Sequence, residues 1–394
     1  MPNKKSTILV LDANQRSALA VVRSLGRHTY LRVITADEAP TALSGSSRYS
    51  AQYFQHPSAA HEPEIFFTWL TEIIQSEKID WVFPTTEISS RTVLQLNNQL
   101  GICRIPFASY ETVLALADKW SLVLLAEKCG VAYPESRHFN SSAEIDERQV
   151  TQYPVVIKPC LSRIRTPSGW LNTTVHVAND VLQLKLLLEK PYLRNYPFIL
   201  QEFIPGHGAG IFALYDHGKP VTFFAHKRLR EKPPAGGVST LSESAPLDPQ
   251  MHGMAKKLLD AAEWHGVAMI EFRVDPAGKA YLMEVNTRFW GSLQLAIDAG
   301  VDFPHLLYRV CNEENPQIVD KYSTGRRLRW LLGDLDNLLL TVRPRSGYSV
   351  FQKLRAVVRF FIPHPFSTRH EINRFDDLAP AWFELKQYIK NLLN

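Results

Sequence analysis

The stretch that decides the fold is MIEFRVDPAGKAYLMEVNTRFWGS, residues 269–292. It is typical of two strands joined by a type I turn at residues 275–278, where proline is second and glycine fourth. Side chains alternate across a strand, so Glu284 and Asn286 share one face, and Glu271 lies on the partner strand. Two carboxylates and a carboxamide are hard oxygen ligands, which suit Mg²⁺ bound together with nucleotide phosphates.

Arg288 follows Asn286 by two residues and adds a planar cation that can hold a carboxylate or a phosphate. The pattern EFRVD…YLMEVNTR resembles the metal-binding end of the ATP-grasp superfamily, especially the half-sites of carbamoyl-phosphate synthase and biotin carboxylase. The resemblance implies that Glu271, Glu284 and Asn286 hold Mg²⁺, with Mn²⁺ as an alternative, and that Arg288 faces the acyl substrate. An isolated E-x-N would more often belong to an ordinary solvent-facing hairpin, so the upstream lysines matter.

Length and composition indicate a multidomain globular chain. Its 394 residues suffice for two or three domains with substantial cores, and 45% are hydrophobic while 21% are charged. No run of about eighteen apolar residues occurs, so no membrane-spanning helix is expected. The four cysteines show neither metal-ligand spacing nor a disulfide framework, which favours a cytoplasmic location.

Strands and helices alternate in the first part of the chain, at residues 7–12, 14–25, 31–35, 64–76 and 80–84. This alternation predicts an α/β fold with an open parallel sheet. The first turn, DANQRS, lacks the G-x-G-x-x-G of a dinucleotide-binding Rossmann domain. The resemblance implies a pre-ATP-grasp domain, which we assign to residues 1–110. Thr85, Thr86 and Glu87 follow a strand end, where they either contact substrate or cap a helix.

An ATP-grasp α+β domain is expected at residues 111–315. One helix is predicted over residues 111–129, and by resemblance its Lys119 reaches the nucleotide phosphates. Lys158 ends an otherwise apolar strand, and because burying an unpaired ammonium is costly, it must reach solvent or an anion. It matches the second ATP-grasp lysine, which contacts the α-phosphate and the edge of adenine.

The flap at residues 160–170 departs from the glycine-rich pattern of the superfamily, since only Ser168 and Gly169 are glycine-like. Arg163 and Arg165 lie nearby, so the flap either holds phosphate through guanidinium groups or closes poorly. The segment FILQEFIPG, residues 198–206, resembles the hinge whose backbone binds adenine. That resemblance assigns four residues to the nucleotide, and the Gln201 carbonyl can accept from the adenine amino group. The four are Gln201, Glu202, Phe203 and Ile204.

A basic segment, HKRLR at residues 226–230, runs into the loop EKPPAGGVS. Cations before a Gly-Gly turn suit an anion such as a triphosphate or an acyl phosphate. We therefore assign Arg228 both to nucleotide binding and, with Arg288, to catalysis. A basic mobile loop between domains is the alternative.

The resemblance fades near Val310, and residues 316–394 are expected to form a basic, mainly helical C-terminal region. Residues 321–394 contain thirteen Lys/Arg against six Asp/Glu, a balance of +7. A basic helix with aromatic residues either lies on a membrane surface or, more commonly, packs on its own domain. No nucleic-acid motif is visible.

Together these features predict an ATP-dependent ligase that activates a carboxylate as an acyl phosphate and joins it to an amine, releasing ADP and phosphate. Its partners would be small-molecule carboxylates and amines, with no nucleic acid. Phe289-Trp290-Gly291-Ser292 replaces the biotin-carboxylase continuation, which argues against biotin-dependent carboxylation. The alternative is a catalytically weak or inactive ATP-binding protein that acts as an assembly or membrane-docked partner. Homo-oligomerisation and peripheral contact with the inner face of the membrane stay open.

Overall fold

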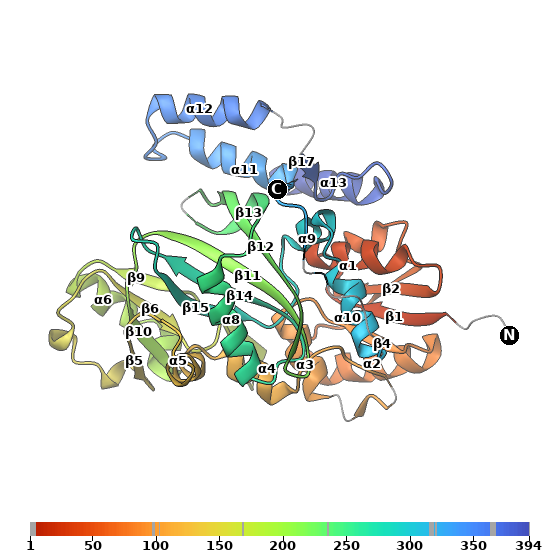
Figure 1. Ribbon diagram of the computed structural model, residues 1–394, viewed down its shortest axis with the longest axis horizontal. Helices are drawn as coiled ribbons and strands as arrows, with labels where there is room; N and C mark the ends of the chain where they lie inside the picture. The colour runs from red at the N-terminus through yellow and green to blue at the C-terminus, as the bar shows by residue number, and fades with distance from the viewer. Residues whose placement is uncertain are drawn as a thin grey trace.

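The computed structural model describes residues 5–96, 99–101, 103–167, 169–234, 236–314, 319, 321–362 and 368–393. Ser168 in the flap and Ala235 in the basic loop lie outside the described residues. Figure 1 shows the N-terminal sheet at one end, two further sheets in the middle and at the other end, and the C-terminal helices above them. Within the described part of the chain, no helix has the length and apolar character needed to cross a membrane.

The N-terminal sheet is open and parallel, as the sequence predicts. Its order is β3-β2-β1-β4, from strands β1 (Ser6–Val10), β2 (Leu31–Asp37), β3 (Gln52–Gln55) and β4 (Trp81–Phe83). Helices α1 (Arg16–Gly26), α2 (Pro63–Glu77) and α3 (Glu87–Gln95) connect the strands, and η1 (Ser44–Ser46) is a short 3₁₀ turn. Alternate β1 residues enter two different buried clusters, because both faces of the sheet are covered.

The prediction of a single helix over residues 111–129 is wrong. The structure has α4 (Tyr110–Ala117) and α5 (Lys119–Lys128), separated by Asp118. Asp118 has an extended backbone, and its carboxylate accepts from Ser121 N at 2.8 Å as the N-cap of α5. Helical periodicity continues through the break, so the apolar pattern alone could not reveal it.

A small antiparallel sheet of order β5-β10-β6-β9 follows. Its strands are β5 (Ser136–Phe139), β6 (Val155–Pro159), β9 (His176–Ala178) and β10 (Phe198–Glu202). Ile157 and Leu200 point to one face and pack in the cluster under α6 (Val181–Leu188) and α7 (Pro191–Asn195). Lys158 and Gln201 therefore lie on the opposite face. The hairpin of β7 (Arg163–Thr166) and β8 (Gly169–Asn172) forms the flap, and η3 (Ser142–Glu144) and η4 (Glu147–Gln149) lie in a loop.

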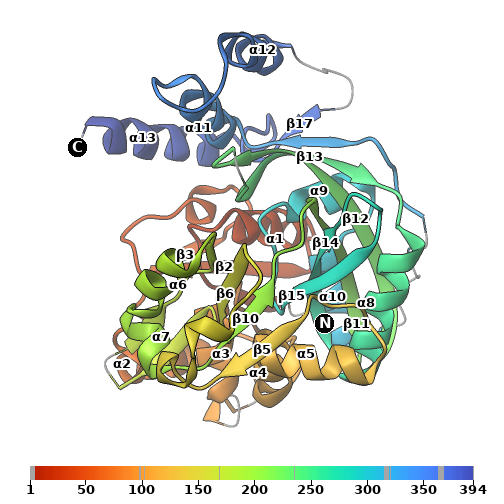
Figure 2. The same cartoon turned by 90° about the vertical axis from the view of Figure 1, so that its left-hand side faces the viewer.

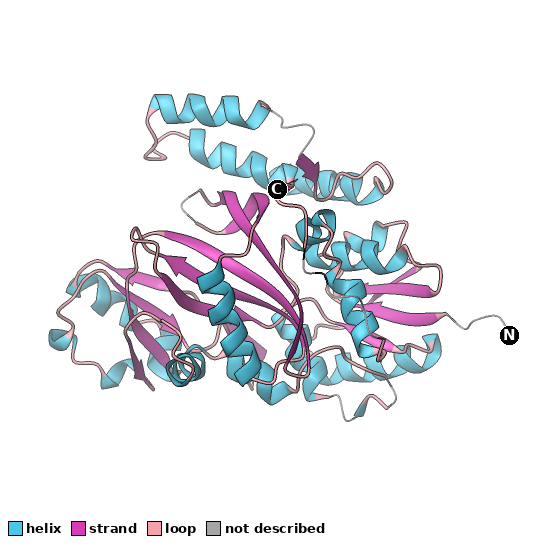
Figure 3. Ribbon diagram, viewed as in Figure 1, coloured by secondary structure: helices cyan, strands magenta, loops and turns pink. Residues whose placement is uncertain are grey.

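The largest sheet has seven strands in the order β15-β14-β11-β12-β13-β16-β17 (Figure 3). Its first five strands along the chain are β11 (His207–Asp216), β12 (Lys219–Lys232), β13 (Val238–Ala245), β14 (Gly266–Val274) and β15 (Ala280–Asn286). Helix α8 (Pro249–Ala261) packs on β11 and β12, and α9 (Leu293–Ala299) and α10 (Phe303–Cys311) contact α1 of the N-terminal sheet. The β14–β15 hairpin, which carries the predicted metal ligands, lies at one edge of this sheet.

The C-terminal region is mainly helical, with α11 (Leu331–Val342), α12 (Val350–Phe361) and α13 (Ala379–Leu393). Two strands that the sequence did not predict, β16 (Arg327–Arg329) and β17 (Thr368–His370), extend the large sheet. Figure 2 shows these helices stacked on top of the sheet. The region is fastened to α1, where the buried Arg23 Nε lies 2.8 Å from Asp377 Oδ2 and its Nη1 donates to Glu371 O.

Candidate active site

The β14–β15 hairpin gathers the three predicted metal ligands. Gly278 N donates to Asp275 O at 3.0 Å, which closes the expected turn. In the register of the hairpin Glu271 is opposite Glu284. The Asn286 Nδ2 atom donates to Glu271 Oε1 and to Glu284 Oε1, both at 3.2 Å. The two carboxylates and the carboxamide are therefore within one hydrogen-bonded group.

Charge in this group is unbalanced in a way that suits a cation. Burial, and then the neighbouring Glu284 carboxylate, raise the pKa of Glu271 above its usual range. Arg228 Nη2 donates to Glu271 Oε2 at 3.0 Å, but Glu284 forms no ion pair among the residues that the structure describes. Half-buried oxygen ligands with an uncompensated carboxylate fit Mg²⁺.

The two arginines assigned to catalysis lie beside the metal ligands. Arg288 Nη2 donates to Asn286 Oδ1 at 3.3 Å, and its Nη1 donates to Phe289 O at 3.0 Å. Arg228 instead pairs with Glu271 and lies 3.4 Å from Glu231. The sequence predicted Arg228 as a phosphate ligand and did not predict that it would neutralise a metal-site carboxylate.

Lys158 faces the hairpin from the small sheet. It pairs with Ile199 in the β6–β10 register, and its Nζ lies 3.5 Å from Met283 Sδ, next to Glu284 in the chain. The residue is 9% exposed, and burial lowers the pKa of its ammonium to about 8, while Glu284 opposes that shift. Lys158 is therefore a buried cation whose pKa is influenced by both carboxylates of the hairpin, Glu284 and Glu271.

Lys119 comes to the same region through the break before α5. Its backbone N–H donates to Cys160 O at 2.8 Å, just past Lys158. Its side chain is buried, and Nζ donates to Ser162 Oγ at 3.1 Å at the base of the flap. The Asp118 cap thus directs Lys119 toward the strand that carries the second lysine.

The predicted hinge joins the two sheets. Gln201 is buried and donates through Nε2 to Ser136 Oγ at 2.9 Å, so its carbonyl stays directed away from that bond. Glu202 is exposed, and its backbone N–H donates to Glu135 O at 2.8 Å. Phe203 is half-buried, and the carbonyl of the buried Ile204 accepts from Arg273 Nε at 3.1 Å.

The flap is packed on the N-terminal sheet domain. Arg165 donates to Gln95 at the end of α3, and Arg91 Nη1 donates to Arg163 O at 2.7 Å. The Arg91 guanidinium lies 4.7 Å from the centre of the Trp170 ring. Arg165 is therefore engaged with α3 in this structure, whereas the sequence left open whether the flap arginines hold phosphate or the flap closes poorly. Thr86 accepts from Ser89 N and caps α3, which favours the helix-capping interpretation of residues 85–87.

A pocket of about 280 Å³ adjoins the metal ligands, and several of its residues escaped the sequence analysis. Arg16, at the start of α1, lies 4.0 Å above the Trp330 ring and forms an ion pair with the buried Glu371. Burial, and then Arg228, lower the pKa of His226 to about 3, so this pocket imidazole is neutral. Its Nε2 is buried without a hydrogen-bond partner among the described residues. No local motif marks Arg16 as a residue of the pocket, because it comes near residues 288–292 only in the folded chain. The lining also includes Met269, Glu271, Asn286, Arg288, Trp290 and Ser292.

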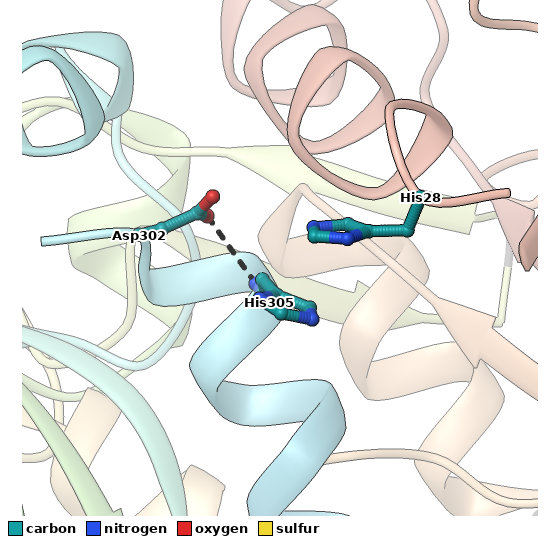
Figure 4. A group of neighbouring side chains, drawn as sticks. All are labelled: His28, Asp302 and His305. Atoms are coloured by element: carbon teal, nitrogen blue, oxygen red, sulfur yellow. Dashed lines mark hydrogen bonds between the residues drawn. The ribbon is translucent and has the colours of Figure 1, made fainter. Parts of the chain in front are cut away.

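Two other groups of potential metal ligands lie apart from the hairpin. One comprises His28, Asp302 and His305, whose imidazole rings stack with centres 3.8 Å apart (Figure 4). Asp302 Oδ1 accepts from His305 N at 3.3 Å as the N-cap of α10, which accounts for its position. The second group is Asp216, His217 and His265, where the two rings again stack, with centres 4.1 Å apart.

Comparison with known proteins supports the fold described above. The family model described as ATP-grasp in the biosynthetic pathway with Ter operon matches residues 194–333. Among curated proteins, none matches the sequence. The N5-carboxyaminoimidazole synthetase of Staphylococcus aureus is a similar solved structure, with 15% identity, 86% of each chain covered and a TM-score of 0.63.

Two further solved structures resemble the chain. Biotin carboxylase of Campylobacter jejuni has 15% identity and a TM-score of 0.64, over 82% of this chain and 74% of that one. The L-amino acid ligase of Bacillus licheniformis has 17% identity and a TM-score of 0.60, over 78% of this chain and 74% of that one. The resemblance expected from the sequence is confirmed, and the chain has the ATP-grasp fold.

Proposed function

We propose that this protein is an ATP-dependent ligase that activates a carboxylate as an acyl phosphate and joins it to an amine, releasing ADP and phosphate. The observation that carries the proposal is the hydrogen-bonded group of Glu271, Glu284 and Asn286, flanked by Arg228 and Arg288. The ligases named among the similar structures support the same reaction class. Free thiols at all four cysteines support a cytoplasmic location.

In this proposal Glu271, Glu284 and Asn286 hold Mg²⁺, with Mn²⁺ as an alternative. When bound, the metal supplies positive charge to the β- and γ-phosphate oxygens. Lys158 on β6 and Lys119 at the start of α5 bind phosphate oxygens, and the hinge at residues 201–204 holds the adenine. Phosphoryl transfer needs positioning and charge neutralisation more than a protein nucleophile, and these residues supply both.

The acid binds in the 280 Å³ pocket, between the hairpin and α1. Arg288 orients its carboxylate oxygen toward the γ-phosphorus, because the guanidinium is fixed by Asn286 and the Phe289 carbonyl. Arg228 makes the metal-binding carboxylates less negative overall, because its guanidinium pairs with Glu271. An amine then attacks the acyl phosphate at its carbonyl carbon, the phosphate leaves, and the amine loses its proton to solvent.

The test is ADP release from Mg²⁺–ATP over pools of carboxylates and amines, with hydroxylamine added in a parallel series. Hydroxylamine intercepts an acyl phosphate as a hydroxamate, so it reports the acid even when the amine is missing. Release that needs an acid, forms a hydroxamate and disappears in Glu284→Ala would support the proposal. ADP release that is independent of any acid, with no hydroxamate, would contradict it.

The second candidate is an ATP-binding protein with little or no catalysis. The flap favours it, because Arg165 is bonded to α3 and the segment lacks the glycine-rich pattern of the superfamily. Mg²⁺-dependent ATP binding without ADP release or hydroxamate from the acid pools would favour this candidate. If Arg165→Ala released ADP from ATP and the wild type did not, the bond between the flap and α3 would be shown to restrain turnover.

A further inference from the structure

Helix α12 presents an apolar face to solvent. Val350, Phe351, Leu354 and Phe361 are 84%, 73%, 60% and 71% exposed, and Val358 is exposed too. Their spacing of three and four residues places these side chains on one side of the helix. Figures 1 and 2 show α12 as the outermost element of the C-terminal region in both views. Neighbouring apolar side chains exposed on an outer helix are typical of an interaction site.

The polar residues of α12 have one sign of charge. Lys353, Arg355 and Arg359 are its charged residues, and the sequence VFQKLRAVVRFF contains no Asp or Glu. Helical geometry puts Arg355 and Lys353 at the two edges of the apolar face, and Arg359 further round the helix, where it lines the pockets between α12 and the sheet. Arg343 and Arg345, both exposed, precede the helix in the chain. The surface therefore combines exposed aromatic and aliphatic side chains with a basic border.

The helix is held from its inner side and its ends, so the outer face is not needed for folding. Ser349 and Gln352 form a capping box at its start. At its end, Arg230 Nη1 donates to Arg359 O at 3.2 Å and Arg329 Nη2 donates to Phe360 O at 3.0 Å. The Arg329 guanidinium also lies 4.3 Å from the centre of the Phe360 ring. Two sheet arginines thus fix the orientation of the helix and leave the apolar face outward.

A second feature of the same chemistry lies beside the helix. A pocket of about 810 Å³ opens between the end of α12 and strands β12, β13, β16 and β17. Ile362 and the fully exposed Phe375 line it together with Arg359. Arg230, Arg327 and Arg329 complete the basic part of its lining. Apolar and guanidinium groups again lie together, as on a surface that meets both acyl chains and anionic headgroups.

We propose that α12 docks the protein on an anionic lipid surface, lying parallel to the membrane with its apolar face in the headgroup region. The basic border would contact lipid phosphates, which attract Lys and Arg near the surface. A second copy of the chain is a poorer occupant, because symmetric pairing of α12 would bring its cations together with no acidic residue of the helix to balance them. The proposal is independent of the ligase activity.

The test is co-sedimentation of the full chain with phosphatidylcholine vesicles and with vesicles of equal parts phosphatidylcholine and phosphatidylglycerol. We expect binding to the mixed vesicles that weakens as salt is raised. The double variant Phe351→Ser/Phe361→Ser should bind at least about tenfold more weakly, since two aromatic side chains no longer leave water. Arg355→Glu should weaken binding to the mixed vesicles and should leave binding to the phosphatidylcholine vesicles unchanged.

The matched control is Lys185→Glu/Leu186→Ser on α6, which also replaces an exposed cation and an exposed apolar residue (Figure 1). It should bind vesicles as the wild type does. Melting temperatures and circular dichroism verify that every variant is folded. The proposal is overturned if the wild type does not sediment with mixed vesicles at low salt, or if the α12 and α6 variants bind equally. A dimer in light scattering that Phe351→Ser/Phe361→Ser converts to a monomer, without vesicle binding, would assign the face to a second copy.

Discussion

Replacing Lys158 by methionine should stabilise the nucleotide-free protein and weaken its binding of ATP. The ammonium is buried beside Met283, and no carboxylate forms an ion pair with it among the described residues. Methionine has a similar length and volume and suits this sulfur-lined environment. The buried ammonium therefore lowers the free energy of unfolding. Its expected benefit is the binding of the nucleotide phosphates.

The magnitude follows from the pKa. Lowering it from the ordinary 10.5 to about 8 disfavours the charged form by about 3 kcal/mol, at about 1.4 kcal/mol for each pH unit. Because the pKa is lower in the folded than in the unfolded chain, the cost is complete below about pH 8. The cost declines as the pH rises from about 8 toward 10.5, and it vanishes above 10.5, where the lysine is neutral in both states. Loss of a charged hydrogen bond to phosphate should weaken ATP by about 1.5–3 kcal/mol, roughly ten- to a hundredfold.

The assay combines denaturant unfolding at pH 7 and pH 10 with calorimetric titration of ATP. Lys158→Met should be more stable than the wild type at pH 7, by up to about 3 kcal/mol, and the difference should shrink at pH 10. The exposed Lys219, replaced by methionine, is the control and should change neither quantity. A Lys158→Met protein that is less stable at pH 7 and binds ATP as tightly as the wild type would refute the reasoning.

Three further predictions concern the framework of the site. Asp377→Ala leaves the buried Arg23 unpaired and should lower the free energy of unfolding by about 3–5 kcal/mol, whereas Asp376→Ala at an exposed ion pair should cost under about 1 kcal/mol in the same denaturation experiment. Gly206→Ala should weaken ATP binding at least about tenfold by calorimetry, because the new Cβ would lie 1.9 Å from a carbonyl oxygen of β14 and distort the hinge. Asp118→Ala should lower stability by about 1 kcal/mol, and substitution by asparagine, which also caps helices, should retain most of it.

The metal role of three residues in the β14–β15 hairpin came from the family resemblance, but local patterns were enough to predict the hairpin itself. Its turn residues, alternation and E-x-N spacing act within about twenty residues, so Glu271, Glu284 and Asn286 meet as expected. Lys158 could also be singled out as a candidate site residue, since a cation at the end of an apolar strand is unusual. The open parallel sheet at the N-terminus followed from alternating strand and helix periods.

Contacts between distant segments could not be predicted in the same way. Arg16 enters the pocket because Glu371 and Trp330, more than three hundred residues away, hold its guanidinium. Strand β16 joins the large sheet by pairing with β13, although its own three residues carry no clear strand pattern. The bond from Arg228 to Glu271 likewise depends on the register of β12 against β11 and on the register of β11 against β14. Each of these features is decided by the packing of complete sheets.

Binding of ATP through a divalent cation at the β14–β15 hairpin is the basis of the proposed function. Its most direct test is calorimetric titration of ATP with and without Mg²⁺, for the wild type, for Glu284→Gln and for Glu127→Gln as an exposed control. The wild type and Glu127→Gln should bind ATP much more tightly with Mg²⁺, and Glu284→Gln should lose most of that gain. Equal Mg²⁺-dependent affinity in all three proteins would contradict the assignment of the metal site.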